Sequence, residues 1–255
     1  MGRVMYRIFE GLMVLALAGL LAAFHFEWSA GAILLKALAS LFFVLAGICG
    51  YRKYEDKRFF SKPVLIALIC SMAGDVLLAL DQDEGILFVL GVASFAAAHV
   101  LFSVAFCRVC AVEKKDIVWT VVVFVLLVPL LLFGNFNFHG LLPVLLGYGA
   151  VISFMMVKAL SFRRCPETGK KVSILIMSGG VLFLLSDVVL LFWLFGVGMP
   201  EGVQWVNWIL YYAAQGCLST ALSVQSDLML GSTGVLPPAN DTDWGYDDEN
   251  KKNEY

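Results

Sequence analysis

Residues 172–196 read VSILIMSGGVLFLLSDVVLLFWLFG, and this stretch decides the class of fold. Asp187 is its only charged residue. A helix needs roughly 20 consecutive apolar residues to cross a hydrocarbon core of about 30 Å. A helix also satisfies the backbone hydrogen bonds of a spanning segment within the segment itself. The stretch therefore predicts a transmembrane helix.

Seven other stretches have the same character, and they run over residues 11–26, 31–50, 63–80, 85–107, 117–134, 141–160 and 203–224. The composition agrees, since hydrophobic residues make up 60% and charged residues 15% of the chain. Soluble proteins have roughly 45–50% and about 25%. The apolar runs are continuous, which argues against the alternating strands of a β-barrel. We therefore predict an all-α polytopic membrane protein with eight transmembrane helices.

The basic residues lie on alternate connections. Except for Lys36, every Lys and Arg precedes the first stretch, lies in or beside the second, fourth or sixth connection, or belongs to the tail. The opposite connections hold acidic residues: Glu27, Asp81, Asp83, Glu84 and Glu201. The positive-inside rule then predicts that both termini are cytoplasmic. Arg3, Arg7 and the first apolar run resemble a signal peptide, but the alternation needs all eight stretches, so we expect this one to be retained.

Two further predictions concern the tail and the cysteines. Residues 227–255 are polar and acidic, which predicts a disordered cytosolic tail after a transmembrane catalytic domain at 1–226. None of the six cysteines falls in a predicted outer loop, so we expect no structural disulfide. Cys107 and Cys110 form a lone Cys-x-x-Cys pair, which lacks the further ligands that zinc needs.

Three charged residues lie well inside predicted spans, namely Lys36, Asp75 and Asp187. A charge at the bilayer centre costs at least about 2.5–3.5 kcal/mol, so such residues face the bundle interior and are usually functional. A structural ion pair between Lys36 and one Asp is the alternative. Small residues, Gly74 and Ser186, precede the two Asp residues and allow close helix approach. Two carboxyls in a low-dielectric bundle do not both ionise easily, and one protonated and one ionised carboxyl suit general acid–base catalysis.

Polar residues on two other spans complete the candidate site. His99 lies in the fourth span, and Tyr211, Tyr212 and Gln215 lie in the eighth, with Tyr211 and Gln215 on one helix face. Residue counting puts His99 nearer the cytosolic side than either Asp, which predicts a tall cavity or a place for His99 at its mouth. One intramembrane His and two separated Asp residues support no dinuclear metal site, and we predict no metal or other cofactor.

These residues resemble the YhhN-like lysoplasmalogenase family. The ordered matches are Lys36, Gly74-Asp75, the stretch 88–99 ending in Ala96-Ala97-Ala98-His99, Ser186-Asp187, and Tyr211-Tyr212-Ala213-Ala214-Gln215. The resemblance covers roughly residues 36–226. Family members often have Pro close behind the Lys, whereas Ala37 and Leu38 follow here, and the acidic tail is not a family feature.

The resemblance implies an integral enzyme that hydrolyses the vinyl-ether bond of lysoplasmalogens to a fatty aldehyde and glycerophosphocholine or glycerophosphoethanolamine. It implies Asp75 and Asp187 as the essential acids, with Lys36, His99, Tyr211, Tyr212 and Gln215 binding substrate or supporting them. It implies no cofactor. Lys36 either meets the substrate phosphate or sets the charge state of the Asp pair, and its depth favours the second role. The expected partners are a lysophospholipid substrate and membrane lipids, with a homo-oligomer left open.

Two rival functions remain. A proton-coupled transporter of a small molecule or lipid would use the same intramembrane Asp, Lys and His groups. A non-catalytic scaffold fits the three intramembrane charges poorly. The sequence lacks the interleaved basic and aromatic residues of nucleic-acid binding. The expected location is the plasma membrane if the protein is bacterial and the endoplasmic reticulum if it is eukaryotic.

Overall fold

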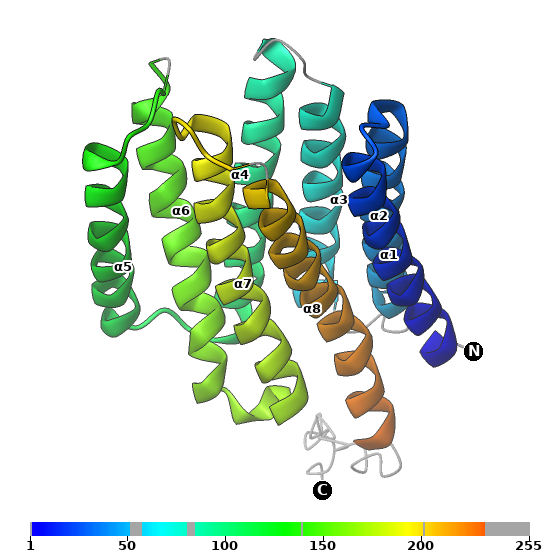
Figure 1. Ribbon diagram of the computed structural model, residues 1–255. Coiled ribbons are helices and arrows are strands. Elements are labelled where there is room, and N and C mark those ends of the chain that lie inside the picture. Colours follow the sequence, from blue (N-terminus) through cyan, green and yellow to red (C-terminus); the bar gives the residue numbers. More distant parts are fainter. Residues whose placement is uncertain (1, 52–57, 81–84, 139, 201, 233–255) are drawn as a thin grey trace, which may run out of the picture.

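The computed structural model describes residues 2–51, 58–80, 85–138, 140–200 and 202–232 (Figure 1). These residues form eight α-helices and two short 3-10 helices. The helices are α1 Gly2–His25, α2 Ser29–Tyr51, α3 Arg58–Leu80, α4 Ile86–Val109, α5 Lys114–Phe133, α6 Leu142–Leu160, η1 Ser161–Arg164, η2 Pro166–Thr168, α7 Lys170–Phe195 and α8 Gly202–Ser232. Each predicted apolar stretch coincides with one helix, so the all-α prediction is confirmed.

Seven helices of the described chain, α1 to α7, are long and apolar enough to cross a membrane. This is consistent with an integral, multi-pass membrane protein. Helix α8 is not among the seven, and polar residues such as Gln204, Asn207 and Gln215 interrupt its apolar sequence. It nevertheless packs antiparallel to α7 along the bundle, and α1 begins at the same end of the bundle at which α8 ends (Figure 1).

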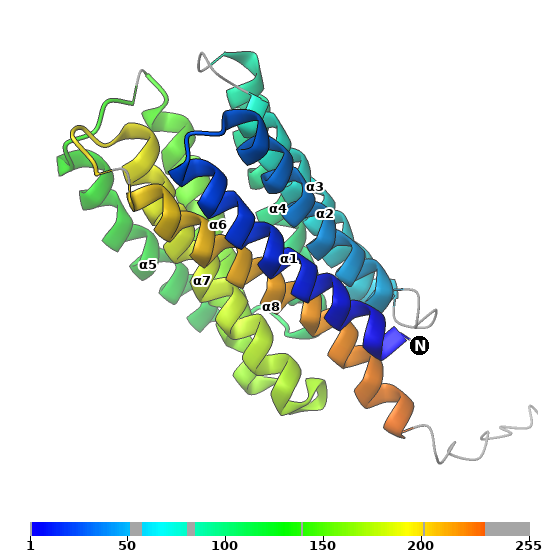
Figure 2. The same ribbon diagram turned by 45° about the vertical axis from the view of Figure 1, so that its right-hand side comes forward.

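Six of the helices form a closed ring. In the order α2, α3, α4, α6, α7 and α8, each helix packs against the next, and α8 closes the ring on α2. Helix α1 lies outside the ring against α2 and α8, while α5 packs chiefly against α6 (Figures 1 and 2). The outer surface is apolar, and Leu15 of α1 and Leu126 of α5 are 68% and 72% exposed. This is the surface expected of a bundle whose solvent is lipid.

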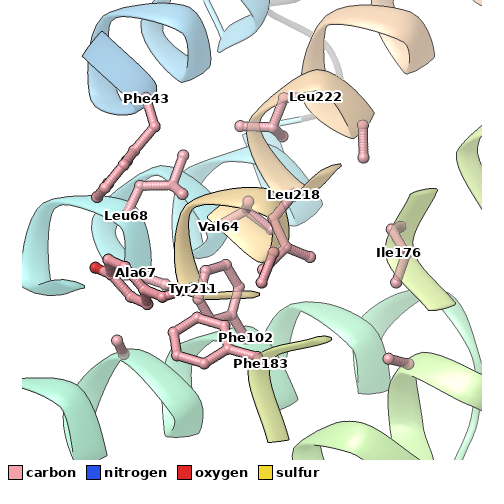
Figure 3. Close-up of a cluster of buried hydrophobic side chains, with 14 of the residues drawn as sticks. Phe43, Val64, Ala67, Leu68, Phe102, Ile176, Phe183, Tyr211, Leu218 and Leu222 are labelled. Carbon is pink, nitrogen blue, oxygen red and sulfur yellow. The ribbon is translucent and has the colours of Figure 1, made fainter. Parts of the chain in front are cut away.

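Aromatic and aliphatic side chains fill the centre of the ring. Tyr211 of α8 lies beside Phe102 of α4 and Phe183 of α7, and Leu218 and Ile176 continue this core along the bundle (Figure 3). The Tyr211 and Phe183 rings meet edge to face, with their centroids 5.6 Å apart. The packing holds the Tyr211 ring in one orientation, and its hydroxyl group thereby points toward α3.

Small residues allow the helices of the ring to approach closely. A Cβ atom added at Gly50 of α2 would lie 2.8 Å from backbone atoms of both Leu222 and Ser223 in α8. A Cβ added at Gly74, directly before Asp75, would lie 2.7 Å from the Phe95 ring. The expected role of Gly74 in close helix contact is thus supported by its surroundings.

Replacing Gly50 with Ala is expected to destabilise the protein by about 1–3 kcal/mol, because the new methyl group meets rigid backbone on α8 and forces the two helices apart. Thermal unfolding in detergent measures the change. Gly11→Ala is the matched control, since a Cβ there has no atom within 4 Å. An equal melting temperature for the two variants would contradict the tight α2–α8 contact.

The expectation of no disulfide is wrong. Cys110, between α4 and α5, is bonded to Cys165, between η1 and η2, and their Cα atoms are 6.2 Å apart. The expectation rested on the cellular compartment alone. The fold brings these two connections together at one end of the bundle, because α5 and α6 are antiparallel neighbours. Cys107 remains free.

The predicted acidic tail falls almost wholly outside the described residues. Helix α8 continues past Ser226 to Ser232, and residues 233–255 are not described. The division into a domain at 1–226 and a tail at 227–255 therefore stays a prediction.

Candidate functional site

Each of the six helices of the ring contributes a polar side chain to one buried site. These side chains are Lys36 and Ser40 of α2, Asp75 of α3, His99 of α4, Tyr148 of α6, Asp187 of α7, and Tyr211 and Tyr212 of α8. The peripheral helices α1 and α5 supply none of them. The ring order thus explains how residues far apart in the sequence meet.

The Asp75 carboxyl is 2% exposed and has partners on helices α2 and α8. Its Oδ2 atom accepts hydrogen bonds from the Ser40 and Tyr211 hydroxyls, each at 2.6 Å. The Lys36 ammonium group lies 3.7 Å from the other oxygen, Oδ1. The depth of Lys36 in its span, seen in the sequence, therefore corresponds to a contact with one of the two acids.

Tyr212 contacts the part of α2 that carries Lys36 and Ser40. Its hydroxyl donates to the Lys36 backbone carbonyl at 3.1 Å and lies 3.2 Å from the Ser40 hydroxyl. Ser40 also reaches the Lys36 carbonyl, at 3.0 Å. The two consecutive tyrosines therefore make different contacts. Tyr211 is hydrogen-bonded to the Asp75 carboxyl, whereas Tyr212 contacts α2, which carries Lys36 and Ser40.

The Asp187 carboxyl has a second set of partners. Its Oδ2 atom accepts a hydrogen bond from the Tyr148 hydroxyl at 2.7 Å and lies 3.1 Å from Nε2 of His99. Tyr148 and His99 are themselves 2.8 Å apart. The three groups form a closed triangle from three helices. The Phe183 ring, 4.6 Å from the His99 ring between centroids, packs against this triangle.

The two acids line one small cavity. Its volume is about 20 Å³, and its wall includes Lys36, Asp75, Asp187, Asn207 and Tyr211. A buried water needs at least about 10–15 Å³ and two to four polar partners. The cavity therefore has room for a water molecule between the Asp75 and Asp187 sites. The pocket that both carboxyls border is the central feature of the site.

An apolar chamber adjoins this polar cavity. Its volume is about 80 Å³, and Tyr148, Ile152, Leu191 and Leu194 are among its lining residues. The cavity and the chamber share four residues: Leu78, Phe95, Asp187 and Leu190. Asp187 borders both spaces, whereas Asp75 borders the polar cavity. The two acids are thus placed at the boundary between a small cavity and a larger apolar space.

His99 makes a contact that the residue count did not anticipate. The residue count placed it nearer the cytosolic side than either Asp, yet it contacts Asp187 directly. The count assumed that the helices begin at a common level. Helix α4 extends farther than α7 and α8 at the end of the bundle where the chain passes from α7 to α8 (Figure 1).

Three residues of the site were missed in the sequence. Ser40 and Tyr148 contact the two acids, and Asn207 lines the cavity and donates to the Ser186 carbonyl at 2.8 Å. Serine and tyrosine are unremarkable within apolar helices, so neither stood out. Asn207 was visible as an amide within the eighth span. Its depth, four residues before Tyr211, was the available indication.

Gln215 and the other histidines lie differently. Gln215 is fully buried, and both atoms of its amide lack a hydrogen-bond partner in the described part of the chain. It is thus not joined to either acid by a direct hydrogen bond. His25 lies at the end of α1, edge-on to the Trp205 ring. His139 lies outside the described residues.

The described residues contain no group of three or more His, Cys, Asp or Glu side chains suited to holding a metal ion. The sequence model of the YhhN family matches residues 31–223, a range that includes all the acids and the supporting residues above. Neither the curated proteins nor the solved structures provide a match. Because the family match covers most of its length, the chain belongs to the YhhN family.

Proposed function

We propose that the protein is a lysoplasmalogenase, which hydrolyses the vinyl-ether bond of a lysoplasmalogen to a fatty aldehyde and glycerophosphocholine or glycerophosphoethanolamine. Membership of the YhhN family supports a hydrolase of this type. The observation that carries the proposal is the shared cavity of Asp75 and Asp187. No cofactor is needed for this chemistry.

The reaction requires an acid and a positioned water. Proton transfer to the alkene carbon that does not bear the oxygen gives an oxocarbenium ion. Water adds to that ion to form a hemiacetal, and the hemiacetal collapses to the aldehyde and the free glycerol hydroxyl. One carboxylic acid supplies the proton, and a carboxylate stabilises the cation and orients the water, as the two acids of glycosidases do. The cavity offers room for that water between the two acids.

We assign proton donation to Asp187 and water orientation to Asp75. The carbon that takes the proton lies on the hydrocarbon side of the ether oxygen. Asp187 borders the apolar chamber, where a hydrocarbon chain would lie, while Asp75 borders only the polar cavity of these two spaces. The Tyr148–His99 pair beside Asp187 positions that carboxyl.

The other residues support the second acid. Lys36 adjoins Asp75 and influences the charge state of that carboxyl, as its depth in the helix predicts. Tyr211 and Ser40 orient the Asp75 carboxyl through their hydroxyl groups. Tyr212 positions α2, and Gln215 provides an unpartnered amide for a buried water or a glycerol oxygen.

The membrane arrangement belongs to the same proposal. We propose that α8 crosses the bilayer as the eighth span, since its polar residues Asn207, Tyr211 and Gln215 face the centre of the ring and not the lipid. Both termini and the acidic tail would then be cytosolic. Under this orientation the Cys110–Cys165 disulfide lies at the cytosolic end, where disulfides seldom persist. Protease protection of a C-terminal tag in sealed vesicles tests the orientation, and a protected tag in right-side-out vesicles would support it.

Aldehyde release by the purified protein tests the proposed reaction. Protein in detergent is expected to release fatty aldehyde from lysoplasmenylcholine or lysoplasmenylethanolamine. The saturated alkyl-ether analogue should remain intact, because it does not form the oxocarbenium ion by protonation. Absence of aldehyde from folded protein with both vinyl-ether substrates would refute the hydrolase. Movement of the lipid across sealed vesicles without aldehyde release would instead support the transporter.

A further inference from the structure

A cleft between α4 and α6 adjoins the apolar chamber on the outer side of the bundle. Its volume is about 360 Å³, and its walls include Val89, Ala93 and Ala96 of α4 and Val144, Gly147 and Val151 of α6. Cleft and chamber share Val92, Leu145 and Tyr148. The two spaces are therefore adjacent, and Tyr148, which is hydrogen-bonded to Asp187, lies at the boundary between them.

The rim of the cleft faces the lipid. Val89 and Val144, on its two sides, are 49% and 54% exposed. Its floor is open because the residues are small, and a Cβ added at Gly147 would have no atom within 4 Å. An apolar opening in the side of a membrane bundle matches the hydrocarbon of a lipid chain, and it gives a lipid access without leaving the bilayer.

The chamber itself follows the length of α7. It runs along α7 from Leu184 to Phe195, a rise of about 16 Å, and Leu127 and Leu131 of α5 cover it. Beyond Phe195, the connection from α5 to α6 pairs with the end of α7 through Asn137 N–H to the Phe195 carbonyl, at 2.9 Å. Such an elongated apolar space is suited to a hydrocarbon chain.

Gly149 of α6 is the residue at which this space is most easily narrowed. It lines the chamber beside Tyr148, and a Cβ added there would make only ordinary contact with Phe124, at 3.7 Å. A larger side chain at this position would extend into the chamber without displacing backbone. The substitution would also favour the helical conformation of α6, because glycine is a poor helix former.

We infer that a single-chain lipid enters sideways through the cleft between α4 and α6 and lays its hydrocarbon chain in the chamber beneath α5, where Gly149 leaves room for the part of the chain beside Asp187. The identity of the headgroup and the cleavage of the ether rest on the proposed function. The binding of the chain does not, because it depends on apolar walls and not on the two acids.

Gly149→Leu tests the chain site. Gly149 follows Tyr148, so the new side chain would fill the chamber beside Asp187, where a chain of any length must pass. With lysoplasmenylcholine of a hexadecenyl chain, the variant should lower kcat/KM by at least about tenfold. A tenfold change corresponds to about 1.4 kcal/mol. Gly11→Leu is the control, since Gly11 lies in open space on the outer face of α1. An unchanged kcat/KM in Gly149→Leu would overturn the inference.

A photo-crosslinking experiment tests the chain site without any reaction. The probe is a saturated alkyl lysophosphocholine with a diazirine near the end of its chain, which the proposed enzyme does not cleave. Labelling should fall on the α5 and α7 walls, around Leu127–Leu131 and Leu191–Phe195, and should weaken in Gly149→Leu but not in Gly11→Leu. Label confined to the lipid-facing side of α1 and α2 would overturn the inference. Correct labelling without aldehyde release would refute the proposed reaction and leave the chain site supported.

Discussion

Replacing Asp187 with Asn is expected to lower kcat for vinyl-ether cleavage by about a thousandfold, within the range of 10²–10⁴ typical of a lost general acid. The amide keeps the shape of the carboxyl and still accepts the hydrogen bond from Tyr148, so the fold should survive. It has no acidic proton to give to the alkene. Aldehyde release under saturating substrate measures the loss.

Two further variants define what the Asp187 result means. Glu113→Gln makes the same chemical change at an exposed carboxyl outside the site, and we expect it to keep its activity. The hydrogen bond from Lys115 lowers the pKa of Glu113, which shows that this carboxyl serves a surface ion pair. Asp75→Asn should also lose most activity, because the water would no longer be oriented. If Asp187→Asn, eluting as folded protein, retained more than a tenth of the activity, the assignment of the acid would be wrong.

Replacing Lys158 with Met is expected to destabilise the protein by about 3 kcal/mol or more, the cost of breaking a buried ion pair. Lys158 is fully buried, and its ammonium group donates to the Asp116 carboxylate and to the Cys110 carbonyl, each at 3.0 Å. The methionine would fill the space but would leave the carbonyl and part of the carboxylate without a partner. Arg164 still contacts Asp116 at 2.6 Å, which keeps the loss near the lower end of the range.

Lys115→Met supplies the comparison. Lys115 also pairs with a carboxylate, Glu113 at 2.9 Å, but both side chains are about half exposed. Exposed pairs contribute about 0–1 kcal/mol, so this variant should melt close to the parent protein. Thermal unfolding of both variants in the same detergent makes the test. Similar melting temperatures for the two would show that burial of Lys158 has no energetic consequence.

The Lys158–Asp116 pair also shows what residue counting overlooks. In the sequence, Lys158 belongs with the basic residues that flank a connection, and nothing distinguishes it from Lys170 or Arg163. In the structure it is fully buried, and it holds the connection after α4 against the start of α5. Charge patterning gives the side of the membrane for such a residue, but it does not say whether the side chain reaches water or a buried partner.

The helical class, the location of the helices and the presence of two acids deep within them could be predicted from the sequence. These follow from one physical cause, the absence of water in the bilayer core. Without water, backbone groups must pair within a helix, and a carboxyl such as Asp75 or Asp187 is retained only at a cost. A few deeply placed charges in long apolar runs are therefore informative without any knowledge of the fold.

The sequence did not reveal which helices are neighbours or which face of each helix turns inward. The tertiary structure placed Tyr148 and His99 on Asp187, Ser40 on Asp75, and Cys110 on Cys165, and it left α5 at the edge of the bundle. The physical reason is that lipid is as apolar as the protein core. The exterior and interior faces of these helices therefore have similar compositions, and the periodic contrast that reveals the buried face of a soluble helix is missing.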